Sequence, residues 1–305
     1  MRLTLLPLAL TAALAVSAAP VYEAYNCGRE RIDQLAVFGD SYSDIRNVYE
    51  LSKHTWPLPK TYFSGRFSNG PMWPEYVARE KRYKLLDYAY GGATSDASVV
   101  QGYSGSDSTL AVPGFIQQIQ TYSPTTRSRA TLARTLFAVN FQGNDFIFSP
   151  DIDTQVVLAN LEGGIRELIA AGAKNFLIVE NFNYGLVPYF SADPAVAAKY
   201  AAIAVKEHAE YQGLIRKLRN EFSGAKACHD GSGIDFKVLD LFEFFRKLTS
   251  PRELHRLGIT ETVKGCVSND YKTVCPNPEK YFYYDGFHAT TKIHREIAGA
   301  VVDLI

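Results

Sequence analysis

Short apolar segments alternate with longer amphipathic segments along most of the chain. The short segments are Leu35–Phe38, Leu85–Tyr90, Leu136–Phe141, Phe176–Phe182 and Phe236–Leu241. They are apolar at nearly every position, which is typical of strands that are buried on both faces of a parallel sheet. Because these strands alternate with helices, the pattern predicts a doubly wound α/β fold with helices on both faces of the sheet.

Two of the longer segments have apolar residues at helical spacing. They are Gln155–Ala171 and Pro194–Phe222. The second follows Asp193, whose carboxylate can accept hydrogen bonds from the free N–H groups of a first helical turn. Ser250 begins a shorter helix in the same way, and Gly258 is expected to end it.

The first residues are expected to form an export signal. Arg2 supplies a positive charge, Leu3–Val16 is apolar and too short to cross a bilayer, and small residues follow at Ser17 and Ala18. No later stretch is long and apolar enough to span a membrane. The chain also shows no internal repeat, low-complexity tract or charged linker. We therefore predict a signal peptide over residues 1–19, a single domain over residues 20–305, and secretion to the extracellular space.

The chain has balanced charge, with 32 basic and 32 acidic residues. Binding to nucleic acid would need a clustered basic face, so this class of partner is excluded. Cys27, Cys228, Cys266 and Cys275 allow two disulfides in an oxidising compartment, and their pairing is open among three arrangements. None of the four has the spacing of a zinc site or a redox pair. We expect no metal and no cofactor, and a monomeric protein.

Glycines and polar residues follow three of the predicted strands. The three segments are Gly39-Asp40-Ser41, Gly91-Gly92-Ala93 and Gly143-Asn144-Asp145. In open parallel sheets the functional residues collect at the carboxyl ends of the strands. We therefore expect these three segments to form one site.

Ser41 and His288 fit the roles of a nucleophile and its general base. Ser41 follows a buried strand on a tight turn, and the N–H groups of a following helix would favour negative charge there. Asp285 stands three residues before His288, an offset at which the other five histidines have no acidic residue. In a helical turn this carboxylate can hold Nδ1–H and leave Nε2 free to accept the serine proton. The structural alternatives are a helix cap for Ser41 and a buried core position for His288.

Ester hydrolysis also requires hydrogen-bond donors for the oxyanion of the tetrahedral intermediate. The backbone N–H groups of Ser41 and Gly92 and the side-chain amide of Asn144 can supply them. A glycine at position 92 allows close approach of the substrate, because it has no Cβ. An ordinary turn at Gly92 and an Asx-turn at Asn144 are the alternatives.

Together these segments resemble the GDSL or SGNH hydrolase superfamily. The matching blocks, in order, are Gly39-Asp40-Ser41, Gly92, Asn144-Asp145 and Asp285 through His288. The run Gly65–Gly70, followed by Trp73 and Tyr76, is similar to longer plant and fungal members, including secreted acetylesterases of carbohydrate esterase family 16. The resemblance implies a three-layer α/β/α sandwich around a mainly parallel five-stranded sheet, similar to flavodoxin. It also implies Ser41, Asp285 and His288 as catalytic residues, with Ser41, Gly92 and Asn144 at the oxyanion hole.

Two positions depart from the pattern of that superfamily. Tyr42 replaces the leucine of the name motif at a packing position. Gln142 stands where the third block usually has glycine, so its side chain could crowd the oxyanion site or redirect Asn144. No Gly-x-Ser-x-Gly motif occurs, which disfavours the ordinary α/β-hydrolase fold.

The sequence therefore predicts a secreted serine esterase that removes O-acetyl groups from carbohydrates by acyl transfer to water. Its partner would be a small-molecule or oligosaccharide ester. One alternative is a GDSL lipase or phospholipase that acts on longer acyl chains. An alternative of another class is a secreted binding protein on a hydrolase scaffold that has lost its activity.

Overall fold

The computed structural model describes residues 31–223 and 233–305. The predicted signal peptide, Cys27 and Cys228 lie outside the described residues. A parallel sheet of five strands forms the centre of the fold, in the order β2-β1-β5-β6-β7. These strands are β1 (Gln34–Gly39), β2 (Lys84–Asp87), β5 (Thr135–Asn140), β6 (Asn175–Val179) and β7 (Asp235–Leu239).

Each apolar segment that predicted a strand overlaps one strand of this sheet, and each strand begins one residue earlier than predicted. All positions of β5 and β6 are buried, which explains why these segments are apolar throughout. Counted within the sheet alone, the strand order is 2-1-3-4-5, the flavodoxin-like arrangement. The predicted α/β fold class is confirmed.

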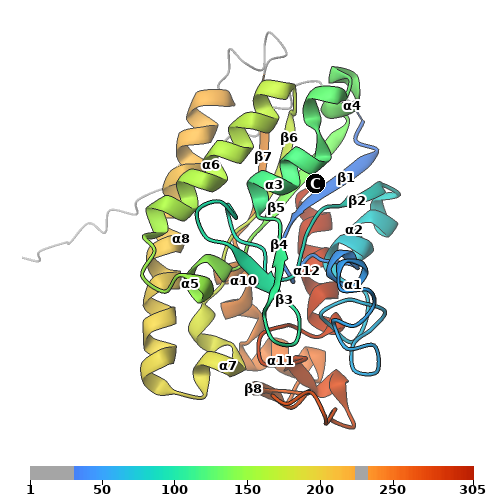
Figure 1. Ribbon diagram of the computed structural model, residues 1–305, viewed down its shortest axis with the longest axis vertical. Coiled ribbons are helices and arrows are strands. Elements are labelled where there is room, and N and C mark those ends of the chain that lie inside the picture. Colours follow the sequence, from blue (N-terminus) through green and yellow to red (C-terminus); the bar gives the residue numbers. More distant parts are fainter. Residues whose placement is uncertain (1–30, 224–232) are drawn as a thin grey trace, which may run out of the picture.

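Helices lie on both sides of the sheet, as Figure 1 shows. Successive residues of a strand point to opposite faces, so Val37 of β1 packs into one core and Phe38 into the other. The first core is covered by α2 (Trp73–Lys81), α10 (Leu241–Leu248) and α12 (Thr291–Leu304). The second is covered by α3 (Phe115–Tyr122), α6 (Thr154–Ala171) and the second half of α8 (Pro194–Phe222).

The predicted helices begin and end close to where the sequence places them. Asp193 caps α8 by accepting hydrogen bonds from the N–H groups of Ala195 and Val196, at 2.8 and 3.2 Å. Gly258 follows α11 (Pro251–Leu257) with a left-handed φ of 66°. Both helix boundaries are thus set by the residues that predicted them.

Shorter elements connect these layers. They are α1 (Asn47–Leu51), the antiparallel pair β3 (Gly102–Ser104) and β4 (Leu110–Val112), η1 (Pro124–Thr126), α4 (Arg129–Ala133), α5 (Asn144–Phe148), η2 (Tyr184–Leu186), α7 (Pro188–Ser191), η3 (Pro278–Lys280), and the parallel pair β8 (Glu261–Gly265) and β9 (Tyr281–Tyr283). A disulfide joins Cys266 to Cys275 between β8 and β9, with a Cα–Cα distance of 4.9 Å. The disulfide prediction is confirmed for this pair.

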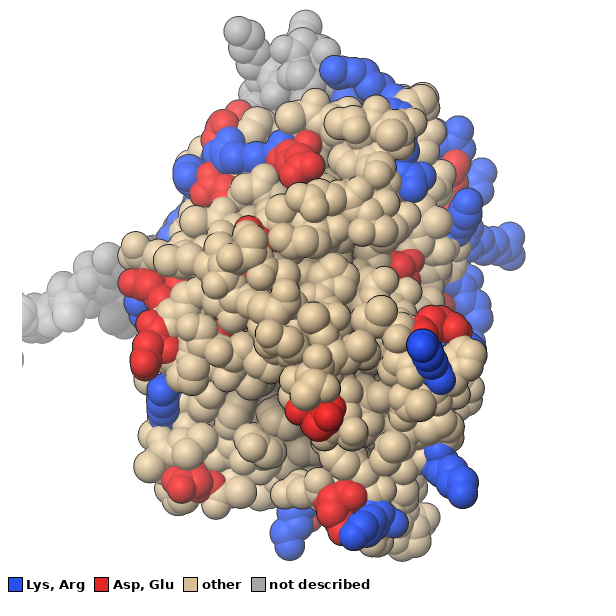
Figure 2. All heavy atoms as spheres, viewed as in Figure 1, with Lys and Arg blue, Asp and Glu red and all other residues tan. Residues whose placement is uncertain are grey.

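In the described ranges, no helix is both long enough and apolar enough to cross a membrane. On the face drawn in Figure 2, charged side chains of both signs are spread around the edge. The centre of that face is largely uncharged. This face therefore lacks the clustered basic surface that binding to nucleic acid requires.

The aromatic stack across three strands should be a main source of stability. Phe176 is fully buried, and its ring centroid lies 5.7 Å from that of Phe137 and 5.3 Å from that of Phe236. Phe176→Ala should lower the free energy of unfolding by about 3–5 kcal/mol, because it leaves a cavity between neighbouring strands. Guanidinium unfolding followed by circular dichroism measures this loss. Phe63→Ala, which truncates an exposed ring, is the matched control and should cost about 0.5 kcal/mol or less.

Candidate active site

Ser41 lies on a tight turn directly after β1. The carboxylate Oδ1 of Asp40 accepts the N–H of Tyr42 at 3.0 Å. Gly39 lies so close to the neighbouring strand that an added Cβ would be 2.6 Å from the carbonyl oxygen of Asn140. The turn is therefore fixed both by its own hydrogen bonds and by close packing against β5.

The expected helix after Ser41 is absent from the position predicted for it. Helix α1 begins only at Asn47 and is five residues long. Backbone N–H groups at its start donate to the carboxylate of Asp44, the shortest at 2.6 Å. The expectation that helix N–H groups would favour a negative charge at Ser41 is wrong, because Asp44 takes those groups. The alternative that Ser41 caps a helix is excluded by the same contacts.

Asp285 holds the ring of His288 through Nδ1. The two carboxylate oxygens lie 2.9 and 2.7 Å from Nδ1, and Oδ1 also accepts the backbone N–H groups of Phe287 and His288. Burial raises the pKa of Asp285, but the charge and hydrogen bond of His288 more than offset it, so the pKa lies below its ordinary value. Within the part of the chain that the structure describes, Nε2 of His288 has no hydrogen-bond partner.

Tyr62 is a contact of this pair that the sequence analysis missed. Its hydroxyl donates to Oδ2 of Asp285 at 2.5 Å, and its side chain is buried. The ring packs edge-on against that of Tyr284, with centroids 5.5 Å apart. Burial and the nearby carboxylate raise the pKa of Tyr62 far above its ordinary value, so the hydroxyl stays protonated and remains a donor.

The turn that carries Ser41 lies against the turn that carries His288. The hydroxyl of Tyr42 donates to the carbonyl oxygen of Phe287 at 2.9 Å. The ring centroids of Tyr42 and His288 are 6.1 Å apart. Burial raises the pKa of Asp40 to about 7, and Asp40 is close enough for the charge of His288 to offset part of this rise. Segments from opposite ends of the chain thus meet beside His288.

Phe67, from the loop before α2, lies against the same ring, and the loop after β2 packs on Phe67. The centroid of Phe67 is 5.1 Å from that of His288, and a Cβ added at Gly91 would be 2.3 Å from the ring of Phe67. Gly92 has a φ of +88°, and a Cβ there would be 2.0 Å from the carbonyl oxygen of Tyr103. Both positions therefore require glycine for close packing.

The three predicted oxyanion donors lie at neighbouring strand ends. Among the residues described by the structure, the N–H groups of Ser41 and Gly92 donate no hydrogen bond. Asn144 Nδ2 donates to the carbonyl oxygen of Ala93 at 2.9 Å and reaches Oδ2 of Asp40 at 3.4 Å. Asn144 thus bridges the segment of Ser41 and the segment of Gly92.

Gln142, which departs from the family pattern, points its side chain toward β6. Its Nε2 donates to the carbonyl oxygen of Glu180 at 3.2 Å, while its backbone N–H donates to Oδ2 of Asp40 at 2.5 Å. Because β6 lies on the opposite side of β5 from β1, this side chain is directed away from Ser41. The side chain of Gln142 is thus bonded to the segment after β6 and does not point into the site of Ser41.

In its described residues, the structure has a serine after the first strand, a histidine held by an aspartate, and unpaired N–H groups at the next strand end. These are the features of serine hydrolases that cleave esters. A family model agrees with this geometry. The chain belongs to the GDSL-like lipase/acylhydrolase family, whose model matches residues 35–301.

The chain is also similar to curated proteins and to solved structures. The chain is 28% identical over 297 residues to a thermolabile hemolysin of Vibrio parahaemolyticus, covering 90% of this chain and 64% of the hemolysin. It is 25% identical over 288 residues to an acetylesterase of Thermothelomyces thermophilus, covering 88% and 87% of the two chains. A solved lipolytic protein of the G-D-S-L family from Veillonella parvula has a TM-score of 0.46 at 12% identity, covering 89% and 97%. The chain thus spans less than two thirds of the length of the hemolysin.

Removing the hydroxyl of Tyr62 should weaken the Asp285–His288 pair. In Tyr62→Phe, we expect the free energy of unfolding to fall by about 1.5–3 kcal/mol at pH 7, because a buried hydrogen bond to a charged group is lost. The Tyr62 bond is one cause of the lowered pKa of Asp285. The difference between variant and parent should therefore be full above the ordinary aspartate pKa and be lost as the pH falls through the lowered pKa of Asp285 in the folded protein. Urea unfolding from pH 7 down to about pH 1 measures this.

Tyr49→Phe is the matched control for Tyr62→Phe, because its hydroxyl makes no hydrogen bond within the described part of the chain. It should leave both stability and its pH dependence unchanged. For Tyr62→Phe we also expect hydrolysis to slow about tenfold, equivalent to about 1.4 kcal/mol in the barrier. A loss of stability that does not change with pH would contradict the role given to the Tyr62–Asp285 bond.

Proposed function

We propose that this protein is a secreted serine esterase that removes O-acetyl groups from carbohydrates. In this proposal Ser41 is the nucleophile, His288 the general base, and Asp285 the acid that orients it. One observation carries the proposal. Asp285 holds Nδ1 of His288 at 2.7 Å, beside the turn of Ser41, and leaves Nε2 without a partner in the described chain.

In the first step, Ser41 Oγ attacks the ester carbonyl carbon while Nε2 of His288 accepts the serine proton. The new imidazolium is stabilised by the carboxylate of Asp285. The tetrahedral intermediate then collapses, the C–O bond to the sugar breaks, and the alcohol leaves with the proton from His288. The product of this step is an acetyl-serine ester.

In the second step, water attacks the acetyl carbon and gives its proton to His288. Collapse of this second intermediate releases acetate and returns the proton to Ser41. In both steps the oxyanion is stabilised by the N–H groups of Ser41 and Gly92 and by the amide of Asn144. For Asn144 this requires release of its longer contact to Asp40, at 3.4 Å. The reaction as written requires no metal or cofactor.

The choice of an acetylated carbohydrate rests on the family and on the balanced charge of the chain. The relative from Thermothelomyces thermophilus is named an acetylesterase, and its alignment covers 88% of this chain. With 32 basic and 32 acidic residues, the chain suits an uncharged substrate. The N-terminal leader pattern supports secretion, and we propose that the enzyme acts as a monomer.

A lipase or phospholipase that acts on longer acyl chains is the second candidate within this family. The family description includes lipases, and exposed apolar side chains lie near the proposed triad. Tyr189 is 56% exposed and stacks on Phe287, the residue before His288, with ring centroids 4.5 Å apart. Such a surface can contact a sugar ring or an acyl chain, so the preferred acyl length must be measured.

Replacement of the proposed nucleophile tests the mechanism. Ser41→Ala should lower the hydrolysis of nitrophenyl acetate by at least about 10³-fold, because no acyl-enzyme can form. It should also abolish covalent labelling by a fluorophosphonate probe. Ser98→Ala, which removes an exposed hydroxyl bonded to Asp96, is the control and should retain both. A parent protein that is folded but neither labelled nor active would support a binding protein that has lost catalysis.

The preference for acyl length distinguishes an acetylesterase from a lipase. We expect kcat/KM on nitrophenyl esters to fall from acetate to butyrate and further to octanoate, and acetate to be released from acetylated oligosaccharides. A rise with chain length would replace the acetylesterase proposal by the lipase alternative. The assay should be run beside Ser41→Ala, so that only hydrolysis through Ser41 is compared.

A further inference from the structure

A second cluster of polar side chains lies at the other end of the same sheet edge. Glu180 directly follows β6, Asp240 directly follows β7, and His208 comes from α8. The backbone N–H of Glu180 donates to the carbonyl oxygen of Leu239 at 3.0 Å, which places the two strand ends side by side. His208 Nδ1 lies 3.5 Å from Glu180 Oε2, and its Nε2 lies 3.8 Å from Asp240 Oδ2. The cluster is separate from the proposed catalytic residues.

The buried atoms of this cluster are incompletely paired. The side chain of Glu180 is fully buried, and Gln212 donates to its Oε2 at 2.7 Å. Within the described residues, its other oxygen, Oε1, has no hydrogen-bond partner, and neither has Nδ1 of His208. Leaving such atoms unpaired in the interior is costly, and an unpaired buried group often marks the place of an ion or a water. A ligand in contact with both atoms would remove this cost.

The charges of the cluster also favour a cation. The carboxylates of Glu180 and Asp240 lie on either side of the imidazole of His208, one near each ring nitrogen. Two carboxylates this close together would both attract a bound cation.

We propose that Glu180, His208 and Asp240 bind a divalent transition-metal ion, for which Zn²⁺ fits best. One imidazole nitrogen and two carboxylate oxygens, one from each residue, lie within 4.8 Å of one another. Zn²⁺ binds such ligands at about 2.0–2.2 Å, so the side chains would close by about an ångström around it. Three protein ligands leave a fourth position for water. The mixed nitrogen and oxygen set suits Zn²⁺ better than Ca²⁺, which takes six to eight oxygen ligands.

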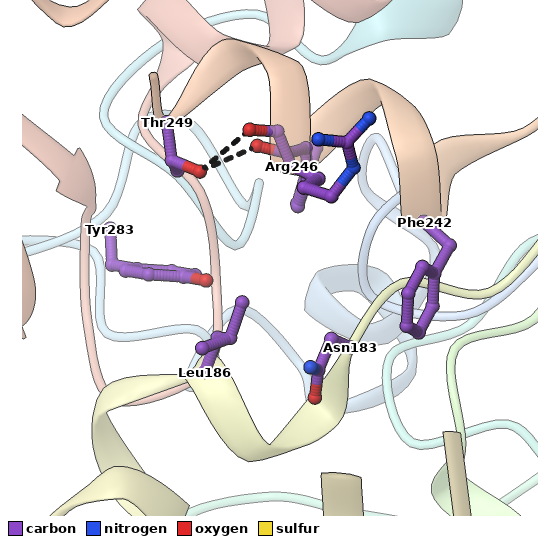
Figure 3. Close-up of a pocket in the computed structure, with 7 residues that line it drawn as sticks. Asn183, Leu186, Phe242, Arg246, Thr249 and Tyr283 are labelled. Carbon is purple, nitrogen blue, oxygen red and sulfur yellow. Dashed lines mark hydrogen bonds between the residues drawn. The ribbon is translucent and has the colours of Figure 1, made fainter. Parts of the chain in front are cut away.

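The surroundings of the cluster support a built site. The ring of Phe242 stacks on that of His208, with centroids 4.7 Å apart and an angle of 18°, which fixes the orientation of the imidazole. Phe242 also lines a groove with Asn183, Leu186 and other residues of η2, α10 and β9, shown in Figure 3. His208 and Asp240 keep partial exposure, 20% and 34% for their side chains, so an ion can enter from solvent.

The metal would join α8 to the ends of β6 and β7. Strands are spaced about 4.8 Å apart, so Glu180 lies about 10 Å from the end of β1, two strands away. At this distance the ion would contact neither Ser41 nor its ester. Its expected effect is on the stability of this half of the sheet edge.

The binding of Zn²⁺ to the untagged mature protein, stripped with EDTA, tests this proposal. We expect one equivalent to bind in isothermal titration calorimetry and to raise Tm, because an ion that binds the folded state stabilises it. Glu180→Gln and His208→Gln should weaken binding by at least about 100-fold and abolish the rise in Tm. The parent in the Ser41→Ala background should bind as tightly as the active protein, so the result does not depend on hydrolysis.

Two further variants make the outcome decisive. Asp240→Asn keeps the hydrogen bond to the N–H of Glu243 that caps α10 but removes a charged ligand, so it tests the site if Glu180→Gln fails to fold. His54→Gln removes an exposed histidine that pairs with Glu50 and should not change binding. Absence of stoichiometric binding to the parent, or retained binding in all three ligand variants, would overturn the proposal. In the first case His208 is an ion-pair partner of the two carboxylates and nothing more.

Discussion

The parallel pairing of β1 with β5 is the constraint on which the rest of the site depends. Gly39 and Asn140 are partners at the end of this ladder. At this end of β1 and β5 the apolar sequence of both strands stops. The buried polar groups that follow need hydrogen-bond partners within the protein. Asn140 is 1% exposed, and its Oδ1 accepts the hydroxyl of Ser43 at 2.9 Å. Trp73 of α2 in turn donates its indole N–H to the same hydroxyl at 3.1 Å. The turn of Ser41 is thus held by a buried polar network.

Asp40 connects the turn of the proposed nucleophile to the segment that carries the proposed oxyanion donor Asn144. One of its oxygens binds the N–H of Tyr42 and the other binds the N–H of Gln142 and the amide of Asn144. Burial raises the pKa of Asp40 to about 7 despite these donors. A carboxylate in this position costs desolvation energy, which the three hydrogen bonds that it accepts from two backbone segments offset in part. The positions of Ser41 and Asn144 are therefore linked through Asp40, which is not one of the proposed catalytic residues.

The parts of this structure that sequence could predict are those set by local contacts. The strands follow from apolar runs, and α8 begins where Asp193 predicts because its cap lies within one turn. The Asp285–His288 pair was predictable for the same reason, since three residues of a tight turn bring the two together.

Contacts between residues that lie far apart in the sequence could not be predicted from any local sequence pattern. Tyr62 reaches Asp285 across 223 positions, through packing of a loop that has no repeating pattern. His208 has Val205 at the offset that identified His288, and its acidic neighbours come instead from two strand ends. In these two cases tertiary packing decides the contact. The helix predicted directly after Ser41 failed for a local reason, because Asp44 accepts N–H groups two to four residues further on and α1 begins only at Asn47.

Gln142 shows how the two halves of the sheet edge are connected. A glycine at this position, as is usual in the family, would keep the backbone bond to Asp40 but would leave the buried carbonyl of Glu180 without the donor that Nε2 supplies. The side chain of Gln142 therefore donates a hydrogen bond to the segment after β6. Its backbone N–H donates to Asp40, which follows β1. The sequence suggested that Gln142 could disturb the oxyanion site. The contacts of Gln142 instead connect the proposed catalytic segments to the Glu180 cluster by hydrogen bonds.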